Sequence, residues 1–156
     1  MKISDLRQEY VQAGLAESDA DTDPLKQFEL WFRQSVDAEL ALPNAMTLAT
    51  IGEDGRPNAR IVLLKGLEQG GFVFFTNFRS HKGRELTRDP RACLLFLWHA
   101  LERQVRIEGR VEKVAAVESD AYFASRPLGA RHSAWASAQS EEVPDRETLE
   151  SALESE

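Results

Sequence analysis

The chain has 156 residues, 42% of them hydrophobic, which suits one domain with a real core. Its formal net charge of −7 argues against general nucleic-acid binding, which needs a basic surface over a whole domain. The N-terminus is polar, and no apolar run approaches the roughly 20 residues that span a bilayer, so we predict a cytoplasmic protein with no membrane contact. A single cysteine, Cys93, excludes an internal disulfide, and the scattered histidines predict no metal site.

The charge changes sign along the chain. Residues 1–59 carry 5 basic and 11 acidic side chains, residues 60–110 carry 10 and 5, and residues 111–156 carry 4 and 10. A basic middle in an acidic chain favours a local anion site, such as a pocket for phosphorylated small molecules. Alternatively, these basic residues lie along strand edges, where lysine and arginine are common.

The first part of the chain is predicted to be helical. A short helix over 4–10 precedes an acidic loop, and Asp23 followed by Pro24 marks a second helix, with an N-cap acid before proline at the first helical position. From there to about Leu40 apolar residues recur at helical spacing, and they most simply pack into the core.

From residue 45 the pattern changes to strands. We expect strands over 45–51, 58–65, 72–76, 91–98 and about 101–114. An Asp-Gly turn joins the first two, and a Gly-Gly turn precedes the third. Consecutive strands joined by short turns pair antiparallel, so the sheet is predicted to be antiparallel.

The second of these strands holds four branched apolar residues between Arg60 and Lys65. A charge is costly to bury without a partner, so the two cations either reach solvent or meet anions. Their five-residue offset places them on opposite faces of an ideal strand. If they meet anions, one of them could hold a cofactor phosphate and the other a substrate phosphate. On spacing alone, ordinary solvated cations at the strand ends are the simpler interpretation.

A helix is predicted over 81–88, with Ser80 as its N-cap. The N-terminus of a helix offers unpaired N–H groups and a partial positive charge, so phosphate binds there. His81 and Lys82 lie in the first turn, where cations oppose the helix dipole. A bound anion would explain this placement. The alternative is that these side chains are simply exposed, at a small energetic cost.

Helices are predicted again over 115–125, over 131–138 and after Asp145, which caps a final stretch. The polar Gln104 either points inward from its strand as a hydrogen-bond donor or is solvated. The order of elements predicts a mainly β fold with helices (α+β). A small antiparallel sheet avoids open edges by closing into a barrel or by pairing with another subunit.

Several short motifs follow one another in a characteristic order. They are Arg7-Gln-Glu-Tyr10, Pro43-x-x-Met46, Arg60-Ile-Val-Leu-Leu-Lys65, Phe74-Phe-Thr-Asn77, Ser80-His-Lys-Gly83, Leu95-Phe-x-Trp98, Leu101-Glu-Arg-Gln-Val105, Tyr122-Phe-x-Ser-Arg-Pro127 and Ala134-Trp-x-Ser-x-Gln-Ser140. Each is weak alone. The ordered set, which covers almost the whole chain, resembles the pyridoxine/pyridoxamine 5′-phosphate oxidases.

The resemblance implies an antiparallel FMN-binding split β-barrel flanked by helices, working as a homodimer with FMN at the subunit interface. The cofactor-binding positions that it implies are Arg60, Ile61, Val62, Leu63, Leu64, Lys65, Phe75, Thr76, His81, Lys82, Gln104, Gln139 and Ser140. The substrate-binding positions are Lys65, Tyr122, Arg126, Arg7 and Tyr10. We expect a helical segment over 1–44, the FMN-binding split-barrel domain over 45–140 and the start of a C-terminal helix over 141–156.

The implied reaction is a cofactor reaction. In this family a phosphorylated B6 vitamer, pyridoxine or pyridoxamine 5′-phosphate, gives a hydride from C4′ to FMN. O2 reoxidises the flavin and is reduced to H2O2. Pyridoxine 5′-phosphate gives pyridoxal 5′-phosphate directly, whereas the amine gives an imine that water hydrolyses to pyridoxal 5′-phosphate and ammonia. The protein holds the two rings in register and neutralises phosphate charge, so no side-chain nucleophile is expected.

Three departures from the family pattern stand out. His81 lies where many relatives have arginine, and Ala130 lies where a substrate-phosphate serine is expected, with Arg131 and Ser133 nearby. The family's C-terminal segment, which carries a Trp-Gly-Gly motif and an Arg-x-His motif, has no counterpart in these 156 residues, so we expect a C-terminally shortened member and identify no catalytic residue. The alternatives are a non-catalytic FMN- or pyridoxal-phosphate-binding split-barrel protein, and a related reductase with another substrate or flavin.

Overall fold

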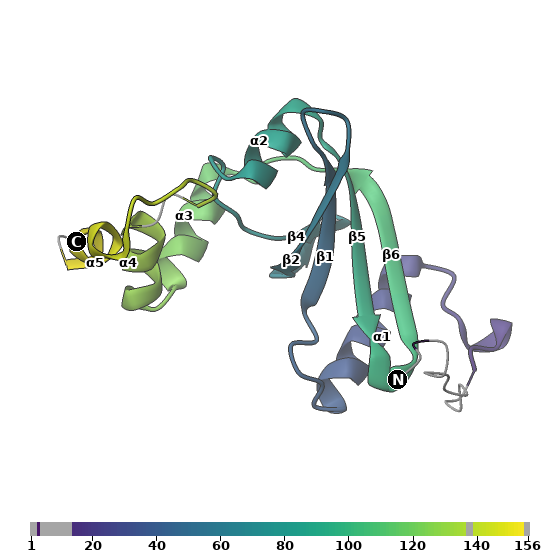
Figure 1. Ribbon diagram of the computed structural model, residues 1–156. Helices are drawn as coiled ribbons and strands as arrows, with labels where there is room; N and C mark the ends of the chain where they lie inside the picture. The colour runs from purple at the N-terminus through teal and green to yellow at the C-terminus, as the bar shows by residue number, and fades with distance from the viewer. Residues whose placement is uncertain (1–2, 4–13, 137–138, 155–156) are drawn as a thin grey trace.

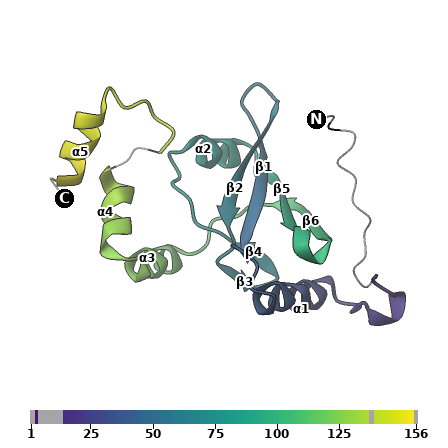
Figure 2. The same ribbon diagram turned by 60° about the horizontal axis from the view of Figure 1, so that its bottom comes forward.

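The computed structural model describes residue 3 and residues 14–136 and 139–154. Figures 1 and 2 show an antiparallel sheet with α1 near one end, α2 at the other end, and α3, α4 and α5 together at one side. The predicted helix over 4–10 lies outside the described residues. None of the described helices is both long and apolar enough to cross a bilayer.

Helix α1 (Pro24–Asp37) follows a single 3-10 turn, η2 (Glu17–Asp19), and begins as predicted. The Asp23 carboxylate accepts a hydrogen bond of 2.9 Å from the Leu25 N–H, one of the donors that a helix start leaves unpaired. The predicted extension to about Leu40 is wrong, because the chain leaves the helix at Ala38 and Glu39 takes a positive φ of 53°.

The main sheet is antiparallel throughout, as predicted. It contains β1 (Ala45–Ile51), β2 (Pro57–Leu63), β5 (Arg91–Trp98) and β6 (Arg103–Arg110), in the order β2-β1-β5-β6. In the register, Leu48 of the central strand lies opposite Arg60 on one side and Leu94 on the other. The predicted strand over 101–114 is shorter because a 3-10 turn, η3 (His99–Leu101), precedes it and the pairing with β5 ends at Arg110.

The predicted strand over 72–76 is only partly correct. A separate two-stranded ribbon forms instead, from β3 (Gly66–Glu68) and β4 (Gly71–Val73). Gln69 and Gly70 both have positive φ, which allows a two-residue turn that pairs the strands on either side of it. Residues 74–80 are therefore released from the sheet and form a loop that leads to the next helix.

The remaining helices agree closely with the sequence pattern. Helix α2 (His81–Arg88) has the predicted bounds. Helix α3 (Ala116–Ser125) is followed by α4 (Leu128–Ala136) and α5 (Arg146–Glu154). The prediction began the fourth helix at residue 131, but it starts directly after Pro127, whose carbonyl accepts the first N–H bonds of the new turn. Asp145 caps the last helix as expected, accepting from the Thr148 N–H at 2.7 Å.

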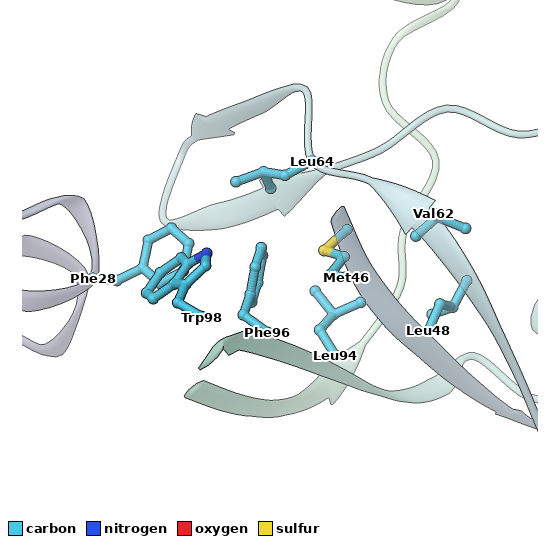
Figure 3. Close-up of a cluster of buried hydrophobic side chains, with 8 residues drawn as sticks. All are labelled: Phe28, Met46, Leu48, Val62, Leu64, Leu94, Phe96 and Trp98. Carbon is cyan, nitrogen blue, oxygen red and sulfur yellow. The ribbon is translucent and has the colours of Figure 1, made fainter. Parts of the chain in front are cut away.

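The core lies between α1, the inner face of the sheet and the ribbon. Its buried side chains are Phe28, Met46, Leu48, Val62, Leu64, Leu94, Phe96 and Trp98, drawn in Figure 3. Phe28 brings α1 onto the sheet, with ring centroids 5.0 Å from Phe96 and 4.9 Å from Phe72 of the ribbon. Burial of such aromatic side chains is the main source of stability here.

The described part of the chain leaves the opposite face of the sheet largely exposed, and this face is partly apolar. Alternation along the strands turns Ile61, Leu63 and Leu97 away from the core, and all three are exposed. Gln104 lies directly opposite Leu97 in the register and is exposed on the same face. Together with the open edges of β2 and β6 among the described strands, this outer face is of the kind that another subunit covers.

Candidate functional site

A broad groove of about 2360 Å³ lies between the sheet, the 74–80 loop, the start of α2 and helices α3 and α4. Ten of the predicted site residues line it: Ile61, Val62, Leu63, Lys65, Phe75, Thr76, Lys82, Tyr122, Arg126 and Gln139. Ligand pockets usually enclose about 300–1,000 Å³. The groove therefore has room for a ligand and for further protein surface beside it.

One side of the groove carries a cation over an aromatic stack. Phe75 of the loop and Tyr122 of α3 stack face to face, with ring centroids 3.8 Å apart and planes 4° apart. The Lys65 ammonium, just past the end of β2, lies 5.7 Å from the centroid of the Tyr122 ring. Arg126 lies one turn further along, with its guanidinium 5.8 Å from the Phe123 ring. Three segments distant in sequence thus meet around one cationic position.

The second cationic position is the N-terminal end of α2. The buried Ser80 hydroxyl accepts from the Gly83 N–H at 3.3 Å and donates to the Asn77 carbonyl at 2.6 Å, so it caps the helix and ties it to the loop. Lys82 donates to the Gln139 side-chain oxygen at 2.8 Å. Partial burial, and then repulsion by Arg60, lower the pKa of Lys82, while Glu85 acts in the opposite direction.

Glycine is required where this helix meets the loop. A Cβ built on Gly83 would lie 2.4 Å from the Phe78 carbonyl oxygen and 2.6 Å from that of Asn77. No side chain could stand at position 83 without moving the backbone, because both neighbouring atoms are main-chain oxygens. The close approach packs the backbone of Asn77 and Phe78 against the start of α2, and Phe75 and Thr76 of the same loop line the groove.

Thr76 presents a buried hydroxyl to this groove. Its Oγ1 has no hydrogen-bond partner among the residues that the structure describes. A buried polar atom normally has a partner, so an orphaned hydroxyl in a groove fits a site that a polar ligand completes.

No group of three or more potential metal ligands occurs in the described part of the chain.

Arg60 does not line the groove; its guanidinium is turned into the junction of sheet and helix. Its Nη2 lies 2.9 Å from Oε2 of Glu85, and its Nη1 donates to the Thr50 hydroxyl and to the Leu48 carbonyl. Asn58 donates to the other oxygen of Glu85 at 2.5 Å. Of the two outcomes predicted for this cation, solvent or an anion, the structure shows an anion within the chain.

Other predicted site residues stand apart from the groove lining. Leu64 is buried in the core, and His81 and Ser140 are exposed. Gln104 is exposed on the outer face of the sheet, so of its two predicted placements the solvated one is observed. Arg7 and Tyr10 lie outside the described residues.

Sequence analysis missed Glu85, Thr50 and Asn58, which form a polar cluster with Arg60. A usable signal was present: Glu85 is the only acid in the basic helix 81–88, and it stands three positions after Lys82, on the same helical face. Of the two residues near the departure at Ala130, Ser133 lines the groove and Arg131 does not.

Comparison with known proteins gives one consistent family. A family model described as pyridoxamine 5′-phosphate oxidase matches residues 32–155. The chain is 62% identical over 149 residues to the pyridoxine/pyridoxamine 5′-phosphate oxidase of Cupriavidus pinatubonensis, covering 96% of this chain and 70% of that protein.

Two solved structures share the fold. PhzG from Burkholderia lata, in complex with tetrahydrophenazine-1-carboxylic acid, is 29% identical, with a TM-score of 0.86 over 92% of this chain and 72% of that one. A pyridoxamine 5′-phosphate oxidase-related, FMN-binding protein from Nostoc punctiforme is 18% identical, with a TM-score of 0.64 over 84% and 73%. The second likeness concerns the fold alone, and together they support the predicted split-barrel class.

Proposed function

Because this chain belongs to the pyridoxamine 5′-phosphate oxidase family, we propose that it oxidises pyridoxine 5′-phosphate and pyridoxamine 5′-phosphate to pyridoxal 5′-phosphate, with FMN as cofactor and O2 as electron acceptor. The observation that carries the proposal is that one groove holds two separate cationic positions. Lys82 stands at the start of α2, and Lys65 stands over the stacked ring of Tyr122. A flavin phosphate and a vitamer phosphate need two such positions.

The residues at the first position suit the cofactor. Lys82, the N-terminal turn of α2 and Gln139 would hold the phosphate of FMN, and the unpartnered Thr76 hydroxyl would bond to the flavin beside Ile61 and Val62. FMN held there would supply the redox chemistry: the hydride from C4′ of the vitamer would go to the flavin, and O2 would take up the electrons and leave as H2O2. The chain supplies no nucleophile to this reaction; it supplies position and charge.

The residues at the second position suit the substrate. Lys65, Tyr122 and Arg126 would bind the 5′-phosphate of the vitamer, with the Lys65 ammonium and the Arg126 guanidinium providing the charge and the Tyr122 hydroxyl a directed donor. The flat aromatic surface of Phe75 and Tyr122 suits a planar pyridine ring. The role of Arg7 and Tyr10 in covering this position stays a prediction.

We also propose that the working unit is a homodimer. The apolar outer face of the sheet, with Ile61, Leu63 and Leu97 exposed, is the surface that a second copy would cover. Ile61 and Leu63 lie on that face and also line the groove, whereas Gln104 lies on the face without lining the groove. A contact between Gln104 and flavin therefore fits a site completed across the interface.

A flavin titration followed by anaerobic reduction tests the proposal. FMN is added to the purified protein, and pyridoxine 5′-phosphate is then added without oxygen. We expect a bound-flavin spectrum that bleaches, and recovery of the absorbance with release of H2O2 when air is admitted. A bound spectrum that stays yellow with both vitamers would contradict the oxidase function.

Two other functions remain as outcomes of that experiment. A bound-flavin spectrum that stays yellow with every substrate would indicate the non-catalytic binding protein. Bleaching only by a substrate of another class would indicate a relative of the kind represented by PhzG, whose fold is shared at 29% identity. The 62% identity to a pyridoxine/pyridoxamine 5′-phosphate oxidase favours the B6 vitamers.

A further inference from the structure

Helix α2 contains one acidic residue, and that residue is buried. Glu85 is 6% exposed and accepts three hydrogen bonds at its carboxylate: from the Thr50 hydroxyl at 2.6 Å, from Asn58 Nδ2 at 2.5 Å and from Arg60 Nη2 at 2.9 Å. Burial alone would raise the pKa of Glu85, but these three donors outweigh it and hold the pKa below its ordinary value. The carboxylate is thus ionised and fully partnered.

These three donors come from two neighbouring strands of the sheet. Thr50 belongs to β1, and Asn58 and Arg60 belong to β2. The same strand β2 leads to Lys65, the cation of the proposed substrate position. A single carboxylate therefore couples α2 to the strand that carries the other half of the groove.

The helix side of this coupling carries the other cation. Lys82 stands three positions before Glu85, so the two residues share one face of α2. Glu85 also attracts Lys82 and so offsets part of the repulsion between Arg60 and Lys82. Its removal would both loosen the helix and leave two like charges facing each other.

We propose that Glu85 is a positioning residue for the phosphate of FMN: by binding Thr50, Asn58 and Arg60 it holds the N-terminal end of α2, with Lys82, at a set place relative to β2. This inference rests on the proposed function, because it assigns a ligand to the start of α2. Glu85 and Arg60 do not line the groove, so both act through Lys82 and the helix end rather than by touching the flavin.

Riboflavin provides the discriminating ligand, because it has the ring of FMN but no phosphate. If Glu85 only stabilises the fold, its substitution weakens the binding of FMN and riboflavin to the same extent. If it positions the phosphate site, only FMN binding weakens. The ratio of the two dissociation constants separates these roles without any measurement of turnover.

The experiment compares the wild type with Glu85→Gln, which keeps the length of the side chain, and with Glu85→Asp, which keeps the charge but shortens the reach. Glu53→Gln in the exposed β1–β2 turn is the matched control for the loss of a carboxylate. Dissociation constants for FMN and riboflavin are measured by quenching of flavin fluorescence. We expect FMN binding to weaken by at least about tenfold in both Glu85 variants, with riboflavin binding changed less than about twofold.

A ratio of FMN to riboflavin affinity that stays at the wild-type value in a folded Glu85 variant would overturn the inference. If Glu85→Gln does not fold because Arg60 is left without its counter-charge, Glu85→Asp decides the question. Failure of the proposed function gives a different result. In one such result, the wild type binds FMN no more tightly than riboflavin. In the other, it prefers FMN, but neither vitamer reduces the bound flavin.

Discussion

Lys82 and Gln139 stand 57 positions apart in the sequence and are joined by a hydrogen bond of 2.8 Å between the lysine ammonium and the amide oxygen. The bond brings the segment after α4 to the start of α2 and closes one side of the groove. A phosphate placed there would have a charged donor from Lys82 and a neutral side chain, Gln139, whose amide nitrogen is also a donor. Its contribution is open to a direct test.

Replacing Lys82 should impair binding of FMN specifically. Lys82→Met keeps the length of the side chain and removes the charge, so we expect FMN to bind about 10- to 100-fold more weakly, the usual value of a charge-assisted hydrogen bond. Riboflavin binding should be unchanged. Lys26→Met, at an exposed position of α1, is the control for loss of a lysine. Equal weakening of both flavins in Lys82→Met would show that the phosphate does not bind at this helix end.

Removing the Tyr122 hydroxyl should affect the vitamer and spare the fold. Tyr122→Phe retains the stack on Phe75 and the contact with Lys65 but loses the donor. We expect KM for pyridoxine 5′-phosphate to rise about 5- to 10-fold, in line with one hydrogen bond of about 1–1.5 kcal/mol. The thermal midpoint and FMN affinity should stay at wild-type values. Unaltered KM with folded, flavin-bound protein would remove Tyr122 from the substrate position.

Gly83→Ala should destabilise the protein although alanine is the better helix former. Alanine gains about 1 kcal/mol of helix propensity over glycine. Its methyl group would collide with the Phe78 and Asn77 carbonyl oxygens, so we expect a net loss of about 2 kcal/mol or more in the free energy of unfolding. Gly129→Ala in α4 is the control, because nothing lies within 4 Å of its Cβ and the substitution should stabilise. Urea unfolding of both variants measures the contrast, and equal stabilisation would refute the close packing at Gly83.

Glu85 should make stability depend on acid pH. Its pKa in the folded protein lies below the ordinary value of 4.5, so its contribution is present above that pH and is lost as the pH falls through the folded-state pKa. Glu85→Gln should be less stable than the wild type near neutral pH and should lose less stability on acidification. Urea unfolding at about pH 7, 5 and 3 compares the two slopes. Parallel loss in both proteins would mean that other carboxylates dominate acid unfolding.

A charge on the outer face of the sheet should prevent dimer formation. Leu97→Glu places a carboxylate at a position that is 63% exposed on that face, and burying it against a second copy would be costly. Leu42→Glu is the control, since Leu42 is 66% exposed in the loop before β1. Light scattering should show a monomer for the first variant and a dimer for the wild type and the control. A dimer in all three would place the interface elsewhere.

The local elements of the fold were predictable because their signals act over a few residues. Asp23 caps α1, Ser80 caps α2 and Asp145 caps the last helix, each through its own side chain and a backbone N–H two or three positions later. The predicted strand over 72–76 failed because a local signal was misjudged. The turn at Gln69 and Gly70 makes a short ribbon of β3 and β4 that ends at Val73, so residues 74–80 form a loop outside the sheet.

The ordered motifs also indicated the family, and with it ten of the residues that line the groove. They did not indicate which of these residues would already have a partner. Arg60 was expected either to reach solvent or to meet an anion, and the sequence did not decide between the two. The structure pairs it with Glu85, 25 positions further on. The contact exists only when α2 folds over the β1–β2 hairpin.

Composition, caps and alternation thus determined the elements, the antiparallel sheet and the cationic character of the middle of the chain. Tertiary structure alone decided that Lys65 meets Tyr122, that Lys82 meets Gln139, and that Gln104 faces away from both. The physical reason is the distance along the sequence between the groups that interact. Hydrogen bonds of turns and caps are settled between neighbours in sequence, whereas the charge partners of a site depend on how helices pack across a sheet.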